Sequence, residues 1–540
     1  MIILFSVLIY FGLLLAFSRL TTRGSSNDTF FRANRRSPWY MVAFGMVGAS
    51  ISGVTFVSVP GMVGASDMTY LQTCMGFILG YIVVAFVLLP IYYRYDLTTI
   101  YTYLSLRLGR CSYLSGASFF LLSKMTGAAA RFYVVCIILQ EFVFDSMGIP
   151  FYITVPLLVV PIWLYTRRGG VKTLVWTDTF QTLCMFAALI LIIIHVTDAL
   201  DMSLGQAMGA VMDSGHSRVF VFDDWVSRQN FWKQFFSGVF IVVVMTGLDQ
   251  DMMQKNLTCK TLREAQKDMC SYGVAFLPAN ALFLSLGVLL MMLAQRTGVD
   301  ASGDQLLPAF AASGELGMAV VVFFTIGIVA ASFSSADSAL TSLTTSYCVD
   351  IRGRANDERL RHRVHVGMAV VFALFILLFR VFNNTSLLDA IYVMCSYTYG
   401  PLLGMFGFAL LTRRTVRDRW VPYIAVASPL ICFGIDTATT ALCGYHFGYE
   451  LLMLNGLLTF AGMWAVSRKG DAQPHPTTGL QALSQPYCYR QRPYHNQGWT
   501  SHMESSPLLC RCLGRSQLSL GLGQVHRCAD GLWRLVSYVT

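Results

Sequence analysis

Charged residues are scarce in this sequence. Asp, Glu, Lys and Arg together make up 13% of its 540 residues, whereas hydrophobic residues make up 55%. So little charge excludes a soluble protein of two or three domains, because it cannot cover the surface of so long a chain. The composition is that of a helical membrane protein with several spans. The net charge of +10 is carried in short segments between apolar runs, which indicates topology signals and no nucleic-acid partner.

Cysteine patterns that bind metals or build a disulfide framework are also missing. The fourteen cysteines include no CxxC pair, and most are scattered through or beside apolar segments, where a thiol serves as a small packing residue. The first apolar stretch, residues 2–18, has no basic leader and no small-residue cleavage site. It therefore predicts a retained helix and not a cleaved signal peptide.

Apolar runs long enough to cross roughly 30 Å of hydrocarbon predict an all-α polytopic membrane protein with about thirteen transmembrane helices. Basic residues occupy every second connecting segment, beginning with Arg19 to Arg36. The positive-inside rule places these segments in the cytoplasm. The prediction is a multi-pass protein of the plasma (inner) membrane, with its N-terminus outside and its C-terminus cytoplasmic. The expected spans are 2–18, 38–60, 71–93, 113–143, 150–166, 173–198, 231–254, 268–295, 317–348, 364–382, 387–411, 420–443 and 447–466.

One apolar run ends in hydroxyl side chains and a carboxylate, "AASFSSADSALTS". Its small residues lie along one face of a helix, a pattern that is also typical of membrane helices that pack closely together. Close packing does not explain Asp337, because a carboxylate at membrane depth costs several kcal/mol without a partner. Hydroxyl, carbonyl and carboxylate oxygens are the ligands an alkali cation needs. The stretch therefore favours a cation site.

Two other spans are interrupted. Glycines, serines and Pro60 break the apolar run from Gly45 to Gly64, which predicts either a simple kink or an unwound segment whose carbonyls line a cavity. The span 231–254 breaks at Gly247 and is expected to continue into the cytoplasm as a charged, amphipathic helix. In the sixth span Asp178 is either a ligand or a carboxylate stabilised by a helix N-terminus.

The fourth span carries Lys124 and Arg131. The planar guanidinium of Arg131 can hold a substrate carboxylate with two parallel hydrogen bonds, or it can pair with a neighbouring acid. The sequence leaves both roles open.

Four motifs together resemble the sodium/solute symporter family, which includes the proline, glucose and sialic acid symporters. They are "GASISG", "WTDTFQ", "TGLDQDMMQKNLTCKTLREAQ" and "AASFSSADSALTS", in this order, and the resemblance covers nearly all of residues 1–466. It implies a leucine-transporter-like 5+5 inverted repeat, with the second to sixth and the seventh to eleventh spans as its halves. The two interrupted spans then begin the two halves, as expected of a binding site near the membrane midplane.

The chain is accordingly expected to have six parts. Residues 1–37 hold the first helix and a basic cytoplasmic loop, 38–198 the first repeat half, 199–230 an extracytoplasmic loop, 231–411 the second half, 412–466 two further helices, and 467–540 a cytoplasmic tail. The tail shows no helical or strand period, which predicts disorder. Its abrupt change of composition also suggests the hypothesis of a translation-frame error, which resequencing the gene would test.

The resemblance implies particular ligands. The main sodium site would use the carbonyls of Gly48, Ile51 and Ala331 and the hydroxyls of Ser334 and Ser335. A second sodium site would use Asp178, Ser334, Asp337 and Ser338, where Asp337 either adds a ligand or carries a proton in place of the ion. The expected solute contacts are Ser52, Thr55, Gln72, Arg131, Met245 and Thr246.

The function that follows is sodium-coupled symport of a small polar or anionic organic solute by alternating access, with Na⁺ as the coupling ion. Symport involves no covalent chemistry, so the protein is not expected to be an enzyme. Each charge entering along the membrane potential supplies about 2.3 kcal/mol per 100 mV, and coupling is a reciprocal binding free energy between ion and solute. The expected partners are the solute and the lipid bilayer. A transporter-like membrane sensor is the alternative; an intramembrane hydrolase using Asp178 and Asp337 fits the surrounding hydroxyls less well.

Overall fold

The computed structural model describes residues 2–21, 27–225, 227–313, 316–382, 387–445 and 447–468. They belong to one compact unit, Met1–Leu483; a second unit, Ser484–Thr540, lies outside the described residues. The expected tail therefore falls outside them from residue 469 onward, and so does the frame-error hypothesis.

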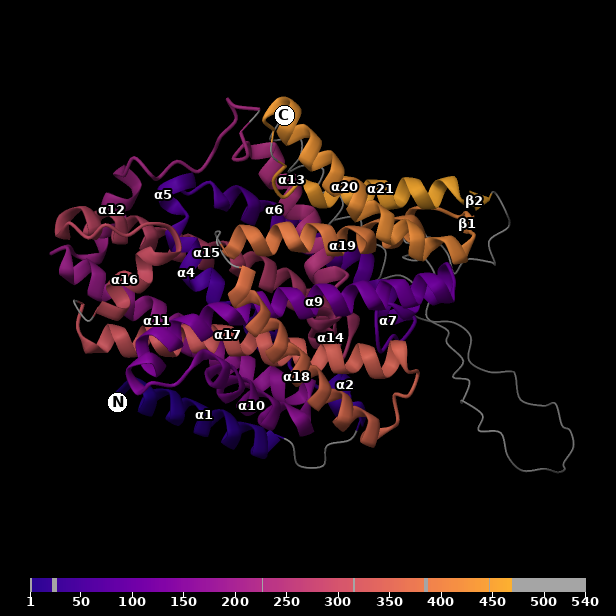
Figure 1. Ribbon diagram of the computed structural model, residues 1–540, viewed down its shortest axis with the longest axis horizontal. Helices are drawn as coiled ribbons and strands as arrows, with labels where there is room; N and C mark the ends of the chain where they lie inside the picture. Colours follow the sequence, from indigo (N-terminus) through magenta and orange to yellow (C-terminus); the bar gives the residue numbers. More distant parts are fainter. Residues whose placement is uncertain are drawn as a thin grey trace, which may run out of the picture. The chain divides into compact units, whose positions relative to one another are not determined.

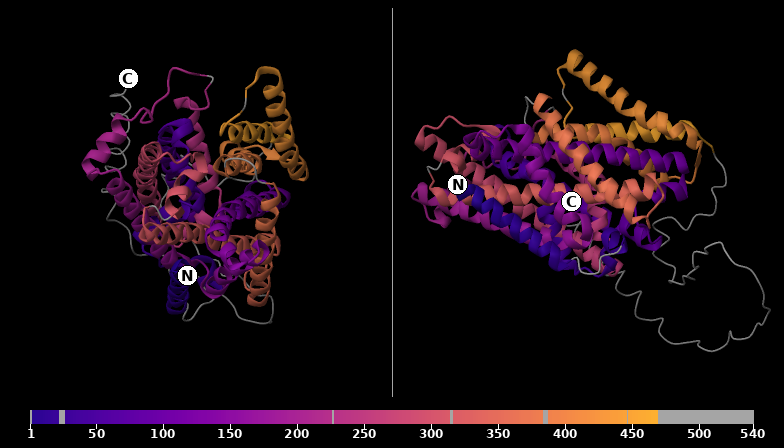
Figure 2. Two further views of the ribbon diagram at one scale, coloured as in Figure 1. Left: turned by 60° about the vertical axis from the view of Figure 1, so that its left-hand side comes forward. Right: turned by 60° about the horizontal axis from the view of Figure 1, so that its bottom comes forward.

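The described chain is almost entirely helical (Figures 1 and 2). Up to residue 225 the helices are α1 (Ile2–Thr21), α2 (Asn27–Arg32), α3 (Trp39–Ser50), α4 (Gly53–Gly61), α5 (Val63–Ser66), α6 (Tyr70–Val83), α7 (Leu89–Arg94), α8 (Thr102–Arg107), α9 (Arg110–Leu139), α10 (Phe151–Gly169), α11 (Val171–Ala199) and α12 (Leu204–Asp213).

Beyond residue 225 the helices are α13 (Phe231–Val242), which continues as a π-helical turn at Val243–Gly247, α14 (Gln250–Asn256), α15 (Leu262–Thr297), α16 (Leu306–Ser313), α17 (Met318–Ser346), α18 (Glu358–Phe382), α19 (Leu387–Leu411), α20 (Val421–Cys443) and α21 (Leu451–Ala465). Two short strands, β1 (Thr415–Val416) and β2 (Ser467–Arg468), pair antiparallel.

Within the described residues, eight helices are long and apolar enough to cross a membrane, or up to ten spans if each of two bent helix pairs counts as one. Three shorter apolar helices, Phe5–Arg19, Phe151–Arg167 and Leu451–Ala465, coincide with further expected spans. The prediction of an all-α polytopic membrane protein is confirmed. The exact number of thirteen spans stays a prediction.

Both interrupted spans are broken helices. The axes of α3 and α4 differ by 59°, and those of the Phe231–Gly247 helix and α14 by 70°. At the first break Ile51 is extended, with φ −81° and ψ 90°. The backbone bonds that a continuous helix would form from Ser52 to Gly48 and from Thr55 to Ile51 are missing, which frees carbonyls in the interior. The first break is thus an unwound segment and not a simple kink.

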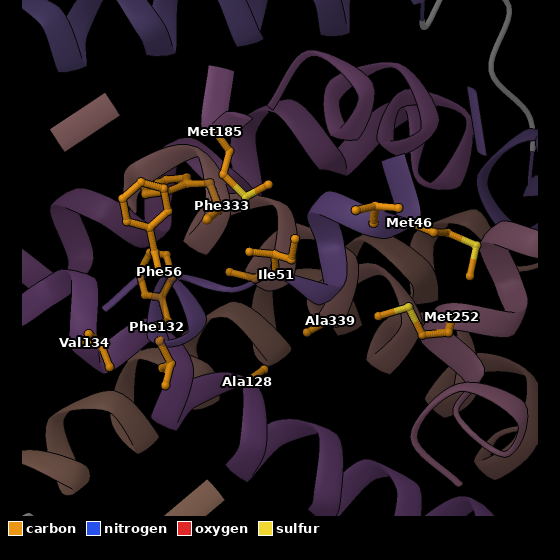
Figure 3. Close-up of a cluster of buried hydrophobic side chains, with 14 of the residues drawn as sticks. Met46, Ile51, Phe56, Ala128, Phe132, Val134, Met185, Met252, Phe333 and Ala339 are labelled. Carbon is orange, nitrogen blue, oxygen red and sulfur yellow. The ribbon is translucent and has the colours of Figure 1, made fainter. Parts of the chain in front are cut away.

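Helix α17 lies at the centre of the bundle, in contact with α1, α4, α9, α11, α14 and α18. Figure 3 shows Ile51 of the first break among apolar side chains from α9, α11, α14 and α17, including Ala128, Met185, Met252 and Ala339. The break is therefore walled by helices that are far apart in sequence.

Beyond its break the seventh span continues as the short helix α14, and its continuation into the cytoplasm stays a prediction. All seven residues of α14 are buried, although they include Asp251 and Lys255. The physical reason is that these charges find ion-pair partners on α9 and α11, so the segment turns inward where its amphipathic pattern alone suggested a solvated surface.

Candidate functional site

The first break and the serine stretch of α17 lie against each other. Ser335 Oγ donates to the carbonyl of Ala49 at 3.0 Å and lies 3.4 Å from the carbonyl of Ala331, one turn earlier on its own helix. A Cβ added to Gly53 would lie 2.0 Å from Ser332 Oγ, so glycine alone permits this approach. The hydroxyl of Ser332 is buried without a hydrogen-bond partner. Free carbonyls and serine hydroxyls thus meet in one buried place.

Of the five residues predicted for the main sodium site, Ala331 and Ser335 lie at this contact. Gly48 and Ile51 lie in the same break, next to Ala49 and two residues after it, and their carbonyls lack the helical backbone bond. Gly48 also permits the close approach of α3 and α11, because a Cβ there would lie 1.9 Å from Thr182 Oγ1 of α11. Sodium binding at these residues stays a prediction.

The fifth residue, Ser334, turns toward α11. Its hydroxyl donates to Asp178 Oδ1 at 2.7 Å. The other carboxylate oxygen of Asp178 lies 2.8 Å from Lys255 Nζ, and both side chains are at most 2% exposed. Asp178 is therefore no carboxylate resting on a helix N-terminus; it is held by a hydroxyl from α17 and an ammonium from α14.

Asp337 is fully buried and has a different set of partners. It accepts from Tyr165 of α10 at 2.7 Å and from the neighbouring Ser338 at 3.2 Å. Within the described residues no lysine, arginine or histidine lies within ion-pair distance of its carboxylate. The four residues predicted for a second sodium site thus form two neighbouring carboxylate clusters.

The second break carries a cluster that the sequence-based predictions did not assign. Lys124 Nζ of α9 lies 2.6 Å from Asp251 Oδ2 and 3.3 Å from Asp249 Oδ2. Asp249 also accepts from Tyr399 of α19 and from the backbone N–H of Asp251, which caps α14. The signal that could have found this cluster is the "DQD" motif directly after a break, opposite a lysine in another span.

The predicted solute contacts mostly lie at the two breaks. Ser52 and Thr55 begin α4 and are buried, and Met245 and Thr246 end the π-helical turn before the second break. Tyr272 of α15 bridges them, since its hydroxyl bonds Ser50 and lies beside Thr246. Figure 1 places α4 beside α15, in agreement with their contacts.

The two remaining predicted contacts lie elsewhere. Arg131 is half-buried on α9, within electrostatic range of Cys395 of α19. Gln72 is fully buried on α6, where its amide donates to the carbonyl of Gln229 and accepts from Val221. Gln229 lies two residues before the start of α13, and α13 and its π-helical turn carry the chain roughly 20 Å from there to Met245. The structure does not bring Gln72 together with the residues at the breaks.

A cavity of about 560 Å³ opens at the far end of α4. Ser58 and Gly61 of α4, Ser237 of α13 and Tyr70 of α6 line it. The hydroxyls of Ser58 and Ser237 are buried and have no hydrogen-bond partner. One half of each broken span thus presents polar groups to the same cavity.

A helical bundle in which two broken spans meet around buried oxygen ligands has the architecture of a secondary transporter. The sodium:solute symporter family model matches residues 30–418. That is more than half of the sequence, so the chain belongs to this family, and the recognition made from the motifs is confirmed. The coupling ion of the family is Na⁺.

Curated relatives agree with this family. The chain is 28% identical to the sodium-dependent multivitamin transporter of Oryctolagus cuniculus over 53% of its length and 44% of the relative. It is 25% identical to the sodium/iodide cotransporter of Homo sapiens over 45% of its length and 37% of the relative. The chain thus spans less than half the length of these two relatives. The sodium/sialic acid symporter of Proteus mirabilis is 23% identical, over 73% of this chain and 81% of the relative.

Solved structures share the fold. A Na⁺-coupled sialic acid symporter in a substrate-bound, outward-open state aligns with a TM-score of 0.72 at 18% identity, covering 87% of this chain and 99% of that one. A nucleobase-cation-symport-1 family transporter in a closed conformation aligns with a TM-score of 0.54 at 17% identity, covering 81% of this chain and 94% of the other. Both are transporters with the leucine-transporter-like fold, so the predicted fold family is confirmed.

Proposed function

We propose that this protein is a sodium-coupled secondary active symporter that imports a small polar or anionic organic solute by alternating access. The observation that carries the proposal is the contact between Ser335 of α17 and the carbonyl of Ala49 at the first break. A small cation bound there would be held by oxygens from two spans at once and would fix their separation. Family membership supports the same coupling ion.

Coupling follows from the position of the break. The freed carbonyls belong to Gly48 and Ile51, at the end of α3 and in the break, and the predicted solute contacts Ser52 and Thr55 follow in the chain at the start of α4. A sodium ion that orders the carbonyls also orders the first turn of α4. The solute then binds to a segment that the ion has already ordered, so the affinity for the solute is higher when sodium is bound. By thermodynamic linkage, bound solute raises the affinity for sodium by the same factor.

The expected arrangement of the chain in the membrane belongs to the same proposal. With the N-terminus outside, the cavity beyond α4 opens to the extracytoplasmic side, and the ion and solute enter through it. The two broken spans then begin the first and second repeat halves, residues 38–198 and 231–411, and rocking of one bundle against the other exchanges access.

A membrane sensor without net transport would use the same ion and solute sites, so binding data cannot separate the two functions. Transport can. Purified full-length protein is reconstituted into proteoliposomes and screened against radiolabelled amino acids, sugars, monocarboxylates and sialic acids, with an inward gradient of sodium or of potassium. Accumulation of one solute only in the sodium gradient is expected. Sodium-dependent binding of a solute without accumulation would instead favour the sensor.

A further inference from the structure

Tyr272 of α15 lies between the two breaks. Its hydroxyl forms a hydrogen bond with Ser50, the last residue of α3. The same hydroxyl is within hydrogen-bonding reach of Thr246, which precedes Gly247 at the end of the π-helical turn. The side chain of Tyr272 is 1% exposed. One buried hydroxyl therefore joins a residue of each broken span at the point where its helix stops.

The ring of Tyr272 has little freedom to move. It packs against Tyr81 of α6, with the ring centroids 4.4 Å apart, and edge-on against Phe276, one turn later on α15. The neighbouring Gly273 lets α6 approach this closely, because a Cβ there would lie 2.6 Å from the Tyr81 ring. Since α15 is one long helix and the ring is packed on two sides, the hydroxyl is held on a rigid support.

Both partners of this hydroxyl lie next to groups that the proposed function needs. Ser50 directly follows Ala49, whose carbonyl accepts from Ser335 at the first break. Thr246 is itself a predicted solute contact. A sodium ion that orders the first break would therefore also fix Ser50, and the hydroxyl of Tyr272 would carry this constraint to Thr246 through a contiguous chain of hydrogen bonds.

Direct contact between the two broken spans is a weaker route. Helix α3 touches α14, and Figure 3 shows Met46 of α3 and Met252 of α14 on the same side of Ile51. Methionine side chains are flexible and adapt to their surroundings. A hydrogen bond constrains both a distance and a direction. The route through Tyr272 is therefore the better one for passing on the orientation of the backbone.

We propose that Tyr272 is a positioning residue that couples the two breaks, so that sodium bound at the first break orders the predicted solute contacts at the second. Tyr272 itself is not among the predicted ion or solute contacts. The inference rests on the proposed function and names the residue through which its ion and solute sites communicate. Tyr272→Phe keeps the ring and its packing and removes only the hydroxyl, so it should leave both breaks formed and uncouple them.

The test uses sodium as the only ligand. Hydrogen–deuterium exchange of the purified full-length protein is followed by mass spectrometry in sodium and in potassium, for peptides that cover residues 48–55 and 243–250. In the wild type, sodium is expected to slow exchange in both peptides, because ordering lowers the population of locally open states. The slowing at residues 243–250 should be about five-fold or more, as is typical of coupled sites. In Tyr272→Phe the slowing at residues 48–55 should remain, and that at residues 243–250 should be lost.

Two further variants sharpen the comparison. Ser50→Ala removes the partner of the hydroxyl at the first break and should uncouple the second break as Tyr272→Phe does, which keeps the test decisive if one variant folds poorly. Tyr103→Phe is the matched control, because its hydroxyl lies 3.5 Å from the carbonyl of Ala409 of α19, and its breaks should respond to sodium as in the wild type. A general loss of stability would speed exchange in sodium and in potassium alike, whereas uncoupling removes the sodium response of one break only.

The outcomes separate this inference from the proposed function. Wild-type protein in which sodium slows exchange at the first break and leaves the second unchanged would overturn coupling through Tyr272, and this result depends on no variant. A second break that still responds to sodium in well-folded Tyr272→Phe and Ser50→Ala would overturn it as well. Wild-type protein in which sodium slows exchange at neither break would contradict the proposed function itself.

Discussion

Ser335 Oγ donates a hydrogen bond to the carbonyl of Ala49 across 3.0 Å, which joins the centre of α17 to the last turn of α3. The hydroxyl proton points at an oxygen that an ion at the break would also approach. When sodium binds, the hydroxyl must rotate and present a lone pair, and the ion takes over the link between the two helices. The two helices are therefore linked at this point both without the ion, by the hydrogen bond, and with it, through the ion.

Ser335→Ala is expected to weaken sodium binding more than it weakens the fold. A hydrogen bond to a charged group contributes about 1.5–3 kcal/mol, so the sodium concentration for half-maximal thermal stabilisation should rise roughly ten-fold or more. The measurement is the melting temperature of purified protein over a sodium series, with potassium keeping the ionic strength constant.

Ser342→Ala is the matched control, since Ser342 is a buried serine of the same helix whose hydroxyl bonds only the carbonyl of Ala339. Its sodium response should equal that of the wild type. Equal responses of the Ser335 and Ser342 variants would remove Ser335 from the sodium site.

Gly48→Ala should impair folding through the contact of α3 with α11. The added Cβ would lie 1.9 Å from Thr182 Oγ1 and 2.7 Å from Thr182 Cβ, so the helices must separate, at a cost of about 1–3 kcal/mol. Gly367→Ala on α18 is the control, because a Cβ at Gly367 meets nothing within 4 Å. Thermal melting compares the two. If both variants melt alike, α3 and α11 are not in this close contact.

The sequence predicts the fold of the site better than its electrostatics. The glycines, the proline and the serine stripe mark the breaks and the small-residue helix, because backbone freedom and side-chain size are local properties. The pairing of Asp178 with Lys255 is not local: it joins α11 to α14, and it depends on the second break turning inward. A charged run after an apolar span looks the same whether it enters water or meets buried partners, so the burial of α14 could not be predicted from the sequence.

Gln72 illustrates a second limit. It was predicted to contact the solute, but in the structure its side-chain amide forms hydrogen bonds with the backbone of the segment before α13. Long connecting segments carry little periodicity, so the residues that such a segment contacts cannot be predicted from the sequence. The broken spans, by contrast, were located within a few residues.

Lys124→Met should destabilise the protein strongly, because it leaves Asp249 and Asp251 buried without their shared ammonium. Breaking a buried pair by removing one partner costs about 3–5 kcal/mol. Arg296→Met is the control: Arg296 pairs with Asp201 at the surface, where both side chains are more than half exposed, and such pairs contribute about 1 kcal/mol or less. Melting curves recorded without added solute should differ accordingly. A small loss in Lys124→Met would mean that the cluster at the second break is not rigid.

The predicted topology can be tested through a native thiol. Cys443 ends α20 and is exposed, and the positive-inside prediction places it on the extracytoplasmic side. A membrane-impermeant maleimide added to intact cells should therefore label the protein, and Cys443→Ser should abolish that labelling. Labelling of Cys443 only after the cells are opened would invert the proposed orientation.

Arg131 offers a test of the class of solute. Its guanidinium is half-buried on α9, and within the described residues no ion pair or hydrogen bond holds it. An unpaired positive charge within a span is costly and is usually retained for a function. If the solute is a carboxylate, Arg131→Lys loses the two parallel hydrogen bonds of the planar guanidinium. The KM for uptake should then rise roughly ten- to a hundred-fold, which corresponds to a loss of about 1.5–3 kcal/mol of binding free energy. The sodium dependence should remain unchanged, because Arg131 lies on none of the elements that form the first break. A wild-type KM of the Arg131→Lys variant for a carboxylate solute in proteoliposomes would exclude Arg131 from recognition of that solute.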